Sequence, residues 1–120
     1  MSLPDISLAV GDRAPAFVQT WIDADGNEVD LTGFTVTFSM QDQGRANPPI
    51  TGSVDVTNTP RGVHALMTYS WGASDTAIAA LYDAEFVATK AGEQMTWPQQ
   101  RGRRPDGTPI TLIVEIRPHV

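Results

Sequence analysis

The sequence has no cysteine among its 120 residues, and it has only two histidines. Without cysteine there is no disulfide framework, no thiol catalyst and no zinc knuckle. No stretch approaches the roughly 20 consecutive apolar residues of a membrane-spanning helix, so we expect a soluble chain without membrane contact. The first ten residues have no basic segment ahead of their short apolar stretch, which is not typical of a signal peptide.

Basic residues are also scarce, with 8 lysines and arginines against 14 acidic residues and a formal net charge of −6. This balance argues against non-specific nucleic-acid binding, which depends on clustered cationic side chains. The length is that of one domain. We expect residues 11–120 to form that domain and residues 1–10 to form an extended N-terminal arm.

The strongest pattern is an alternation of apolar and polar residues with period 2, which indicates half-buried strands. It is clearest over residues 34–40, 63–71 and 82–88, and weaker over residues 16–22, 52–56, 94–97 and 110–116. Segments rich in Gly, Pro, Asn and Asp separate these runs and read as turns. The pattern predicts an all-β, antiparallel β-sandwich of about seven strands.

One short segment has a different character. Ser74 or Asp75 can cap a first helical turn, and the run that follows up to Leu81 contains few helix-breaking residues. The sequence therefore predicts one or two helical turns over residues 74–81, crossing between the two sheets.

Tyr82 follows this crossing at the position where an immunoglobulin-like sandwich often has a tyrosine that bonds to upstream backbone. We interpret Tyr82 as such a structural corner. Ala84 occupies the site of the usual cysteine, which excludes the disulfide-bonded antibody version. The three tryptophans are interpreted as residues of the core and its rim, because buried aromatic side chains dominate the energetics of small cores.

Few residues suggest a metal-binding or catalytic site. Asp23, Asp25, Asn27 and Glu28 surround Gly26 like calcium ligands, but the loop is too short for a calcium-binding loop and is better explained as a hairpin turn. His64 and His119 lie in no metal-ligand spacing. No serine nucleophile elbow and no phosphate-binding glycine loop is present, so we expect neither an enzyme nor a cofactor.

Two segments are candidate assembly contacts. Arg101, Arg103 and Arg104, set against a single acid, Asp106, give residues 99–109 a net charge of +2. This segment either forms a solvated hairpin or docks on an acidic partner. The arm has no obvious strand partner, so it either folds back over its own sandwich or adds a strand to a neighbour. Its apolar residues are Leu3, Ile6, Leu8 and Val10.

The order of several short motifs resembles a known family. These are Gly-Asp at 11–12, Trp-Ile-Asp-Ala-Asp-Gly at 21–26, Val-Asp-Leu-Thr-Gly at 29–33, Tyr-Ser-Trp at 69–71, Leu-Tyr-Asp-Ala-Glu-Phe at 81–86 and Thr-Trp-Pro at 96–98. Together, over residues 8–98, they resemble the immunoglobulin-like N-terminal domain of phage baseplate upper proteins and related small phage structural proteins.

The resemblance implies a non-enzymatic structural subunit of a tailed-phage or prophage particle, made in the bacterial host cytoplasm and residing in the virion. Its partners would be other virion structural proteins, in many copies, at the tail or baseplate, the neck or the head surface. The alternative is a module that binds a glycan or the host surface, for which the sandwich loops and an exposed Trp97 would serve.

Overall fold

The computed structural model describes residues 5–13, 15–23, 25–72, 74–98 and 112–118. The described part of the chain is all-β and contains no helix. Its nine strands are β1 (Ile6–Ala9), β2 (Phe17–Thr20), β3 (Thr35–Asp42), β4 (Ile50–Ser53), β5 (Asp55–Asn58), β6 (His64–Tyr69), β7 (Ala80–Lys90), β8 (Glu93–Trp97) and β9 (Leu112–Arg117).

Six strands form a large mixed sheet in the order β1-β9-β7-β3-β4, with β8 also paired to β7. The long strand β7 organises this sheet. One of its edges pairs with β3 over eight residues, and its other edge is shared by β9 and β8. Phe86 lies opposite Trp97 of β8 and Ala84 lies opposite Leu112 of β9, so β8 and β9 extend along the same side of β7.

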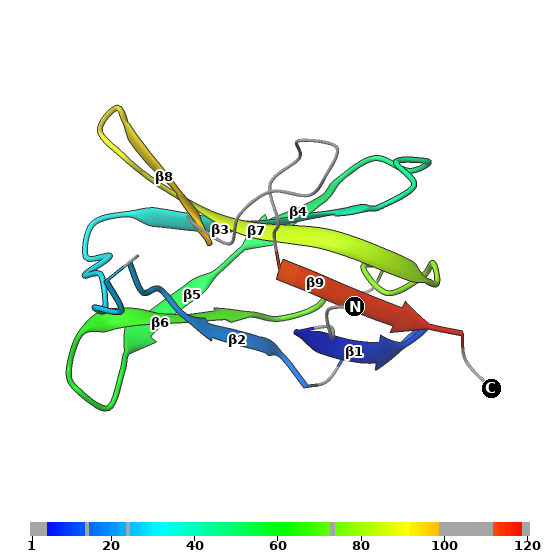
Figure 1. Cartoon of the computed structure of the whole chain (residues 1–120), viewed down its shortest axis with the longest axis horizontal. Coiled ribbons are helices and arrows are strands. Elements are labelled where there is room, and N and C mark those ends of the chain that lie inside the picture. Colours follow the sequence, from blue (N-terminus) through cyan, green and yellow to red (C-terminus); the bar gives the residue numbers. More distant parts are fainter. Residues whose placement is uncertain (1–4, 14, 24, 73, 99–111, 119–120) are drawn as a thin grey trace.

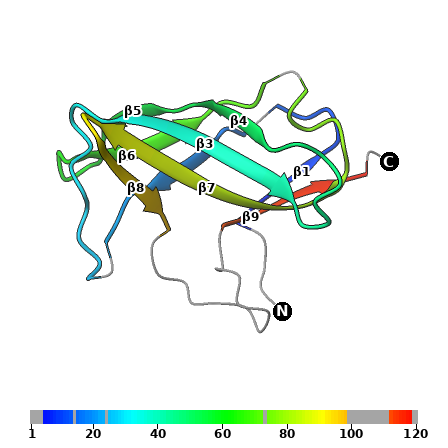
Figure 2. The same cartoon turned by 90° about the horizontal axis from the view of Figure 1, so that it is seen from above.

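The other three strands form a small antiparallel sheet in the order β2-β6-β5. It lies below the large sheet in Figure 1, and Figure 2 shows the large sheet from above. The chain passes from one sheet to the other between β4 and β5, at Val54, whose amide donates to the Val36 carbonyl at 3.1 Å. This two-layer arrangement is consistent with a β-sandwich.

The core lies between the two sheets and follows from the period-2 alternation. In β3, β6 and β7 every second residue is buried, because successive side chains of a strand point to opposite faces. Phe38 of β3 lies at the centre of the core. Its ring centroid is within 5.8 Å of the rings of four other aromatic residues, Phe17, Tyr69, Trp71 and Phe86.

The structure corrects the predicted strand count and the description of the N-terminal arm. Residues 50–58 form two strands rather than one, and Ile6–Ala9 of the supposed arm form β1. β1 pairs in parallel with β9, so the sheet is mixed and not purely antiparallel. Leu8 is 1% exposed. Burial of this leucine, together with backbone pairing, explains why the segment folds onto its own sandwich.

The predicted helical crossing is also wrong, because turns occupy residues 74–76 and bends follow at 77–78. The hydroxyl of the buried Thr76 donates to the Asp12 carbonyl at 2.8 Å, and the Thr76 carbonyl accepts from the Gly11 amide at 3.1 Å. These bonds tie the segment to the N-terminal strand instead of to its own next turn. No helix in the described residues is long and apolar enough to span a membrane.

Tyr82 begins the buried row of β7 and its hydroxyl donates to the Ile78 carbonyl at 2.8 Å. The acceptor lies four residues upstream, on the segment that connects the small sheet to the large one. β7 already begins at Ala80, so the last two residues of the predicted helix are extended, which is a second reason why residues 74–81 do not form one.

We expect Tyr82→Phe to lower the free energy of unfolding by about 1 kcal/mol, because the ring remains buried and only one hydrogen bond is lost. Urea denaturation of the two proteins measures this difference. An unchanged midpoint at equal slope would show that the bond to Ile78 does not hold the corner.

Candidate functional site

A cavity of about 260 Å³ with largely apolar walls lies at one end of the sandwich. It lies between the loop that joins β3 to β4 and the segment that joins β6 to β7. The β3–β4 loop is at the right-hand end of Figure 1, opposite the β7–β8 turn. We refer to this feature as the end cavity. A concave site with apolar walls and a few polar groups is the usual form of a binding pocket.

Asp42 builds the first wall of the end cavity. It continues the inward row of β3, is 5% exposed, and accepts from the backbone amides of Ala46 at 2.8 Å and Asn47 at 3.2 Å. The side-chain amide of Gln41 also donates to the Asn47 backbone carbonyl at 2.9 Å. These bonds fix the loop so that Asn47, Pro48, Pro49 and Ile50 line the cavity. Two consecutive prolines restrict this wall further.

Asp75 builds the second wall. Its Oδ2 accepts from the Gly72 amide at 2.7 Å and from the Tyr69 hydroxyl in a short hydrogen bond. The Ala77 amide donates to the Ser74 carbonyl at 3.2 Å, which closes the turn. The wall then presents Ser74, Asp75 and Ile78 to the cavity, and Tyr82 lines it from β7. Both walls are therefore preformed by hydrogen bonds within the chain.

The rim is unusually apolar for a solvent-exposed end of the molecule. Ile78 is 48% exposed, and the nearby Leu81 on β7 is 43% exposed. Exposed apolar side chains next to a preformed cavity mark a contact site more often than isolated ones do. The end cavity can thus bury part of a partner.

The two tyrosines beside the cavity favour the neutral phenol. Burial, together with the hydrogen bond to Asp75, raises the pKa of Tyr69, and burial with the nearby charge of Asp42 raises the pKa of Tyr82. In the folded chain both groups keep their protons at a pH at which the unfolded chain releases them.

We therefore expect the free energy of unfolding to fall as the pH rises above the ordinary tyrosine pKa of 10.0. Below that pH these two tyrosines should cause no change of stability with pH. Urea unfolding from about pH 8 to about pH 11 measures the trend. Tyr69→Phe should make the decline shallower. An equal slope in both proteins would contradict the role of Tyr69.

The structure places the arm candidates unevenly. Ile6 and Leu8 belong to β1, and Val10 follows it with its amide bound to the Arg117 carbonyl at 2.8 Å. Leu8 is buried in the core and is not available to a neighbour. The hypothesis that the arm is free for strand addition is wrong for these residues, while Leu3 lies outside the described residues.

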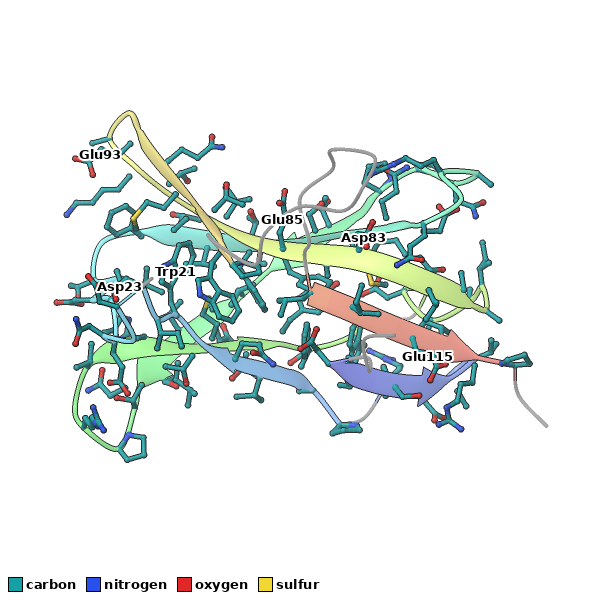
Figure 3. All side chains as sticks on the ribbon, in the orientation of Figure 1. Trp21, Asp23, Asp83, Glu85, Glu93 and Glu115 are labelled. Carbon is teal, nitrogen blue, oxygen red and sulfur yellow. The ribbon has the colours of Figure 1, made fainter. Side chains whose placement is uncertain are left out.

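Arg101, Arg103 and Arg104 also lie outside the described residues. The structure shows the strands on either side of this segment, β8 before it and β9 after it. β8 ends at Trp97, opposite Phe86 of β7, and β9 begins at Leu112, opposite Ala84 of β7. Glu85 of β7 lies between the residues opposite these two ends. Figure 3 shows that Glu85 and Asp83 both lie on the outer side of the large sheet.

The acidic turn after β2 uses its carboxylates for structure. Asp23 Oδ1 accepts from the amides of Asp25 and Asn27, each at 2.9 Å, and Gly26 adopts a φ of 85°. Ile22 and Glu28 form an isolated antiparallel bridge around this turn. The hairpin interpretation is thus confirmed. Within the described residues no group of three or more His, Cys, Asp or Glu could hold a metal ion.

The tryptophans are buried, as the sequence predicted. Trp21, Trp71 and Trp97 are 0%, 2% and 7% exposed. The indole of Trp71 donates to the Pro15 carbonyl and that of Trp97 to the Ile22 carbonyl, both at 2.9 Å. Trp97 is therefore no exposed platform for a sugar ring, which removes one of the two features that favoured a glycan-binding module; the other is the sandwich loops.

Sequence reasoning missed the end cavity because one of its walls lies in a segment read as an ordinary turn and the other in residues 74–81, which were predicted to be helical. One signal was present. Asp42 falls on the apolar row of its strand after Val36, Phe38 and Met40, and a buried acid in such a row needs hydrogen-bond donors nearby. Those donors are the backbone amides of Ala46 and Asn47 in the following loop. The position of Asp42 in the apolar row therefore indicates that its side chain holds the β3–β4 loop.

Comparisons with protein-family models, with curated proteins and with solved structures give no match to this chain.

Proposed function

We propose that this protein is a non-enzymatic structural subunit of a tailed-phage or prophage particle, and that it acts through contacts with other virion proteins. The observation that carries the proposal is the end cavity, whose walls are fixed in advance and whose rim exposes Ile78 and Leu81. A preformed apolar site lowers the entropic cost of association, as a permanent assembly contact requires.

The connection of the strands supports the immunoglobulin-like part of the proposal. A small sheet β2-β6-β5 faces a large sheet in which β9, β7, β3 and β4 are neighbours, and β1 runs parallel to β9. This order corresponds to an immunoglobulin sandwich whose last strand is split into β8 and β9. The bond from Tyr82 to the Ile78 carbonyl has the form of the tyrosine corner.

The resemblance of residues 8–98 to phage baseplate proteins provides the expected setting, which is the tail or baseplate, the neck or the head surface. Arg101, Arg103 and Arg104 remain candidate contacts to an acidic neighbouring surface, because arginine forks bind carboxylates. The alternative of a module that binds a glycan or the host surface rests on the sandwich loops alone, because Trp97 is buried.

The test is incorporation into particles. In particles assembled from variant genes, we expect Ile78→Asp, and separately the joint change of Arg101, Arg103 and Arg104 to serine, to reduce the copy number of this protein. Quantitative mass spectrometry of purified particles measures it. Arg61→Ser, in the β5–β6 turn at the other end of the molecule, is the matched control and should be incorporated normally.

Normal incorporation of both sets of variants would place the interface elsewhere. Absence of the wild-type protein from purified particles, despite its presence in the lysate, would reject the structural role itself.

A further inference from the structure

Three oxygen-bearing side chains line the end cavity and have acceptor capacity to spare. Asp75 Oδ1, the Ser74 hydroxyl and the Asn47 side-chain amide take part in no recorded hydrogen bond or ion pair with the described residues. Asn47 lines the cavity from the first wall, and Ser74 and Asp75 line it from the second, so both walls offer acceptors. These acceptors are open to solvent, and a ligand that brings hydrogen-bond donors can take the place of water at them.

We propose that the end cavity receives the side chain of a lysine from a partner protein. The proposal deepens the proposed function and rests on it, since it identifies the chemistry of the contact. The ammonium group of lysine carries three donors, and Asp75, Ser74 and Asn47 offer three acceptors. The carboxylate adds a charge-assisted hydrogen bond.

The apolar walls fit the rest of such a side chain. Pro48, Pro49, Ile50, Ile78 and Tyr82 supply hydrocarbon and ring surface, which matches the four-carbon stem of lysine. Lysine commonly buries its stem along apolar surface while its charged end meets polar groups. Each wall of the cavity combines apolar surface with at least one hydrogen-bond acceptor, so a side chain with a hydrocarbon stem and a charged end meets both.

Asp75 discriminates against arginine. Its Oδ2 already accepts from Gly72 and Tyr69, which leaves Oδ1 alone for a ligand. A guanidinium binds a carboxylate best through two parallel hydrogen bonds, one to each oxygen. An ammonium group needs a single open oxygen, so the geometry favours lysine.

A second copy of this chain is a poor source of the lysine. Lys90 is the only lysine in the sequence, and its Nζ lies 5.3 Å from the centroid of the Phe34 ring, in a cation–π contact. Its stem also packs over Gly33. Insertion into a neighbouring copy would break these contacts, whereas a lysine of another protein breaks none in this chain.

The probe is a set of three blocked tripeptides, acetyl-Ala-Xaa-Ala-amide, in which Xaa is lysine, arginine or norleucine. Titration of the labelled full chain, followed by amide chemical shifts in NMR, gives the affinities. We expect the lysine peptide to shift the amide signals of Asn47, Ile50 and residues 74–78. It should bind about tenfold more tightly than norleucine, which lacks the charge-assisted bond.

Two pairs of variants locate the binding. Ile78→Ser removes apolar surface from the cavity, and Val18→Ser is its control, because Val18 on β2 is similarly exposed but does not line the cavity. Asp75→Asn removes the charge, and Glu93→Gln is its control, because it changes the net charge equally at the opposite end of the molecule (Figure 3). Only the first member of each pair should weaken lysine binding, by several-fold. If Asp75→Asn does not fold, the double variant Asn47→Ala with Ser74→Ala tests the other two acceptors of the cavity and should also weaken lysine binding.

The proposal would be overturned if the lysine and norleucine peptides bound with equal affinity, or if neither bound detectably. Tighter binding of the arginine peptide than of the lysine peptide would overturn it as well. Self-association that Lys90→Gln abolishes would make a second copy the occupant and reject a separate partner. These outcomes are independent of particle assembly. Lysine binding without incorporation into particles would reject the proposed function alone, and incorporation without lysine binding would reject this inference alone.

Discussion

Phe38→Ala is expected to destabilise the protein by about 3–5 kcal/mol, the range for removing a large aromatic side chain from a packed core. Phe38 is 0% exposed and contacts aromatic rings from both sheets, including a stacked contact with Tyr69 at 4.3 Å between centroids. The truncation therefore removes contacts on both sides of the core and leaves a cavity where the two layers meet.

Because small domains are stable by only about 5–15 kcal/mol, this loss should remove a large part of the total stability. Urea denaturation followed by fluorescence measures it. Thr37→Ala, at the exposed neighbouring position of β3, is the control and should change the midpoint little. A loss below about 1 kcal/mol for Phe38→Ala would contradict the central position of this ring in the core.

Gly52→Ala is expected to cost about 3 kcal/mol, at the upper end of the range for overpacking. A Cβ atom at Gly52 of β4 would lie 2.6 Å from Cε1 and 2.8 Å from the hydroxyl oxygen of Tyr69. The Tyr69 ring cannot easily move, because it is stacked on Phe38 and its hydroxyl is bound to Asp75. The glycine is needed for this close approach.

The matched control is Gly44→Ala, since a Cβ there would be 3.6 Å from the nearest atom, an ordinary contact with Asp42. A second control removes the obstacle. In a Tyr69→Ala background the added methyl group of Gly52→Ala should cost much less, so the two changes should be strongly non-additive. Additive effects would mean that Tyr69 is not the group that requires glycine.

The sequence predicted those strands whose burial follows from local alternation. β3, β6 and β7 were found because their inward rows are apolar, and the turns between strands were found from their Gly, Pro, Asn and Asp residues. The burial of Trp97 and the turn closed by Asp23 followed from the same local chemistry.

Pairing between distant segments was not predictable in this way. β1 pairs with a strand more than one hundred residues away, Ile6 lying opposite Val114, and such a partner leaves no mark on the local sequence. The helix over residues 74–81 was wrong because Thr76 and Tyr82 draw its backbone groups into tertiary bonds. Tertiary contacts commonly override a weak helical propensity.

The candidate site was missed for a related reason. The walls of the end cavity are loops, and they take their shape from Asp42 and Asp75, which accept from backbone amides. Each carboxylate is recognisable only when its burial or its partners are known. The arginine segment, by contrast, is conspicuous in the sequence, and its role in assembly stays a prediction.

The most direct test of the account is photo-crosslinking in assembled particles. A photoreactive phenylalanine analogue at position 78, on the rim of the end cavity, should link this protein to another virion protein, identified by mass spectrometry of the linked peptides. The same analogue at position 61, in the turn at the opposite end, should give much less of that product. Particles that contain the protein but yield no partner crosslink from position 78, or the same crosslink from position 61, would contradict a contact through the end cavity.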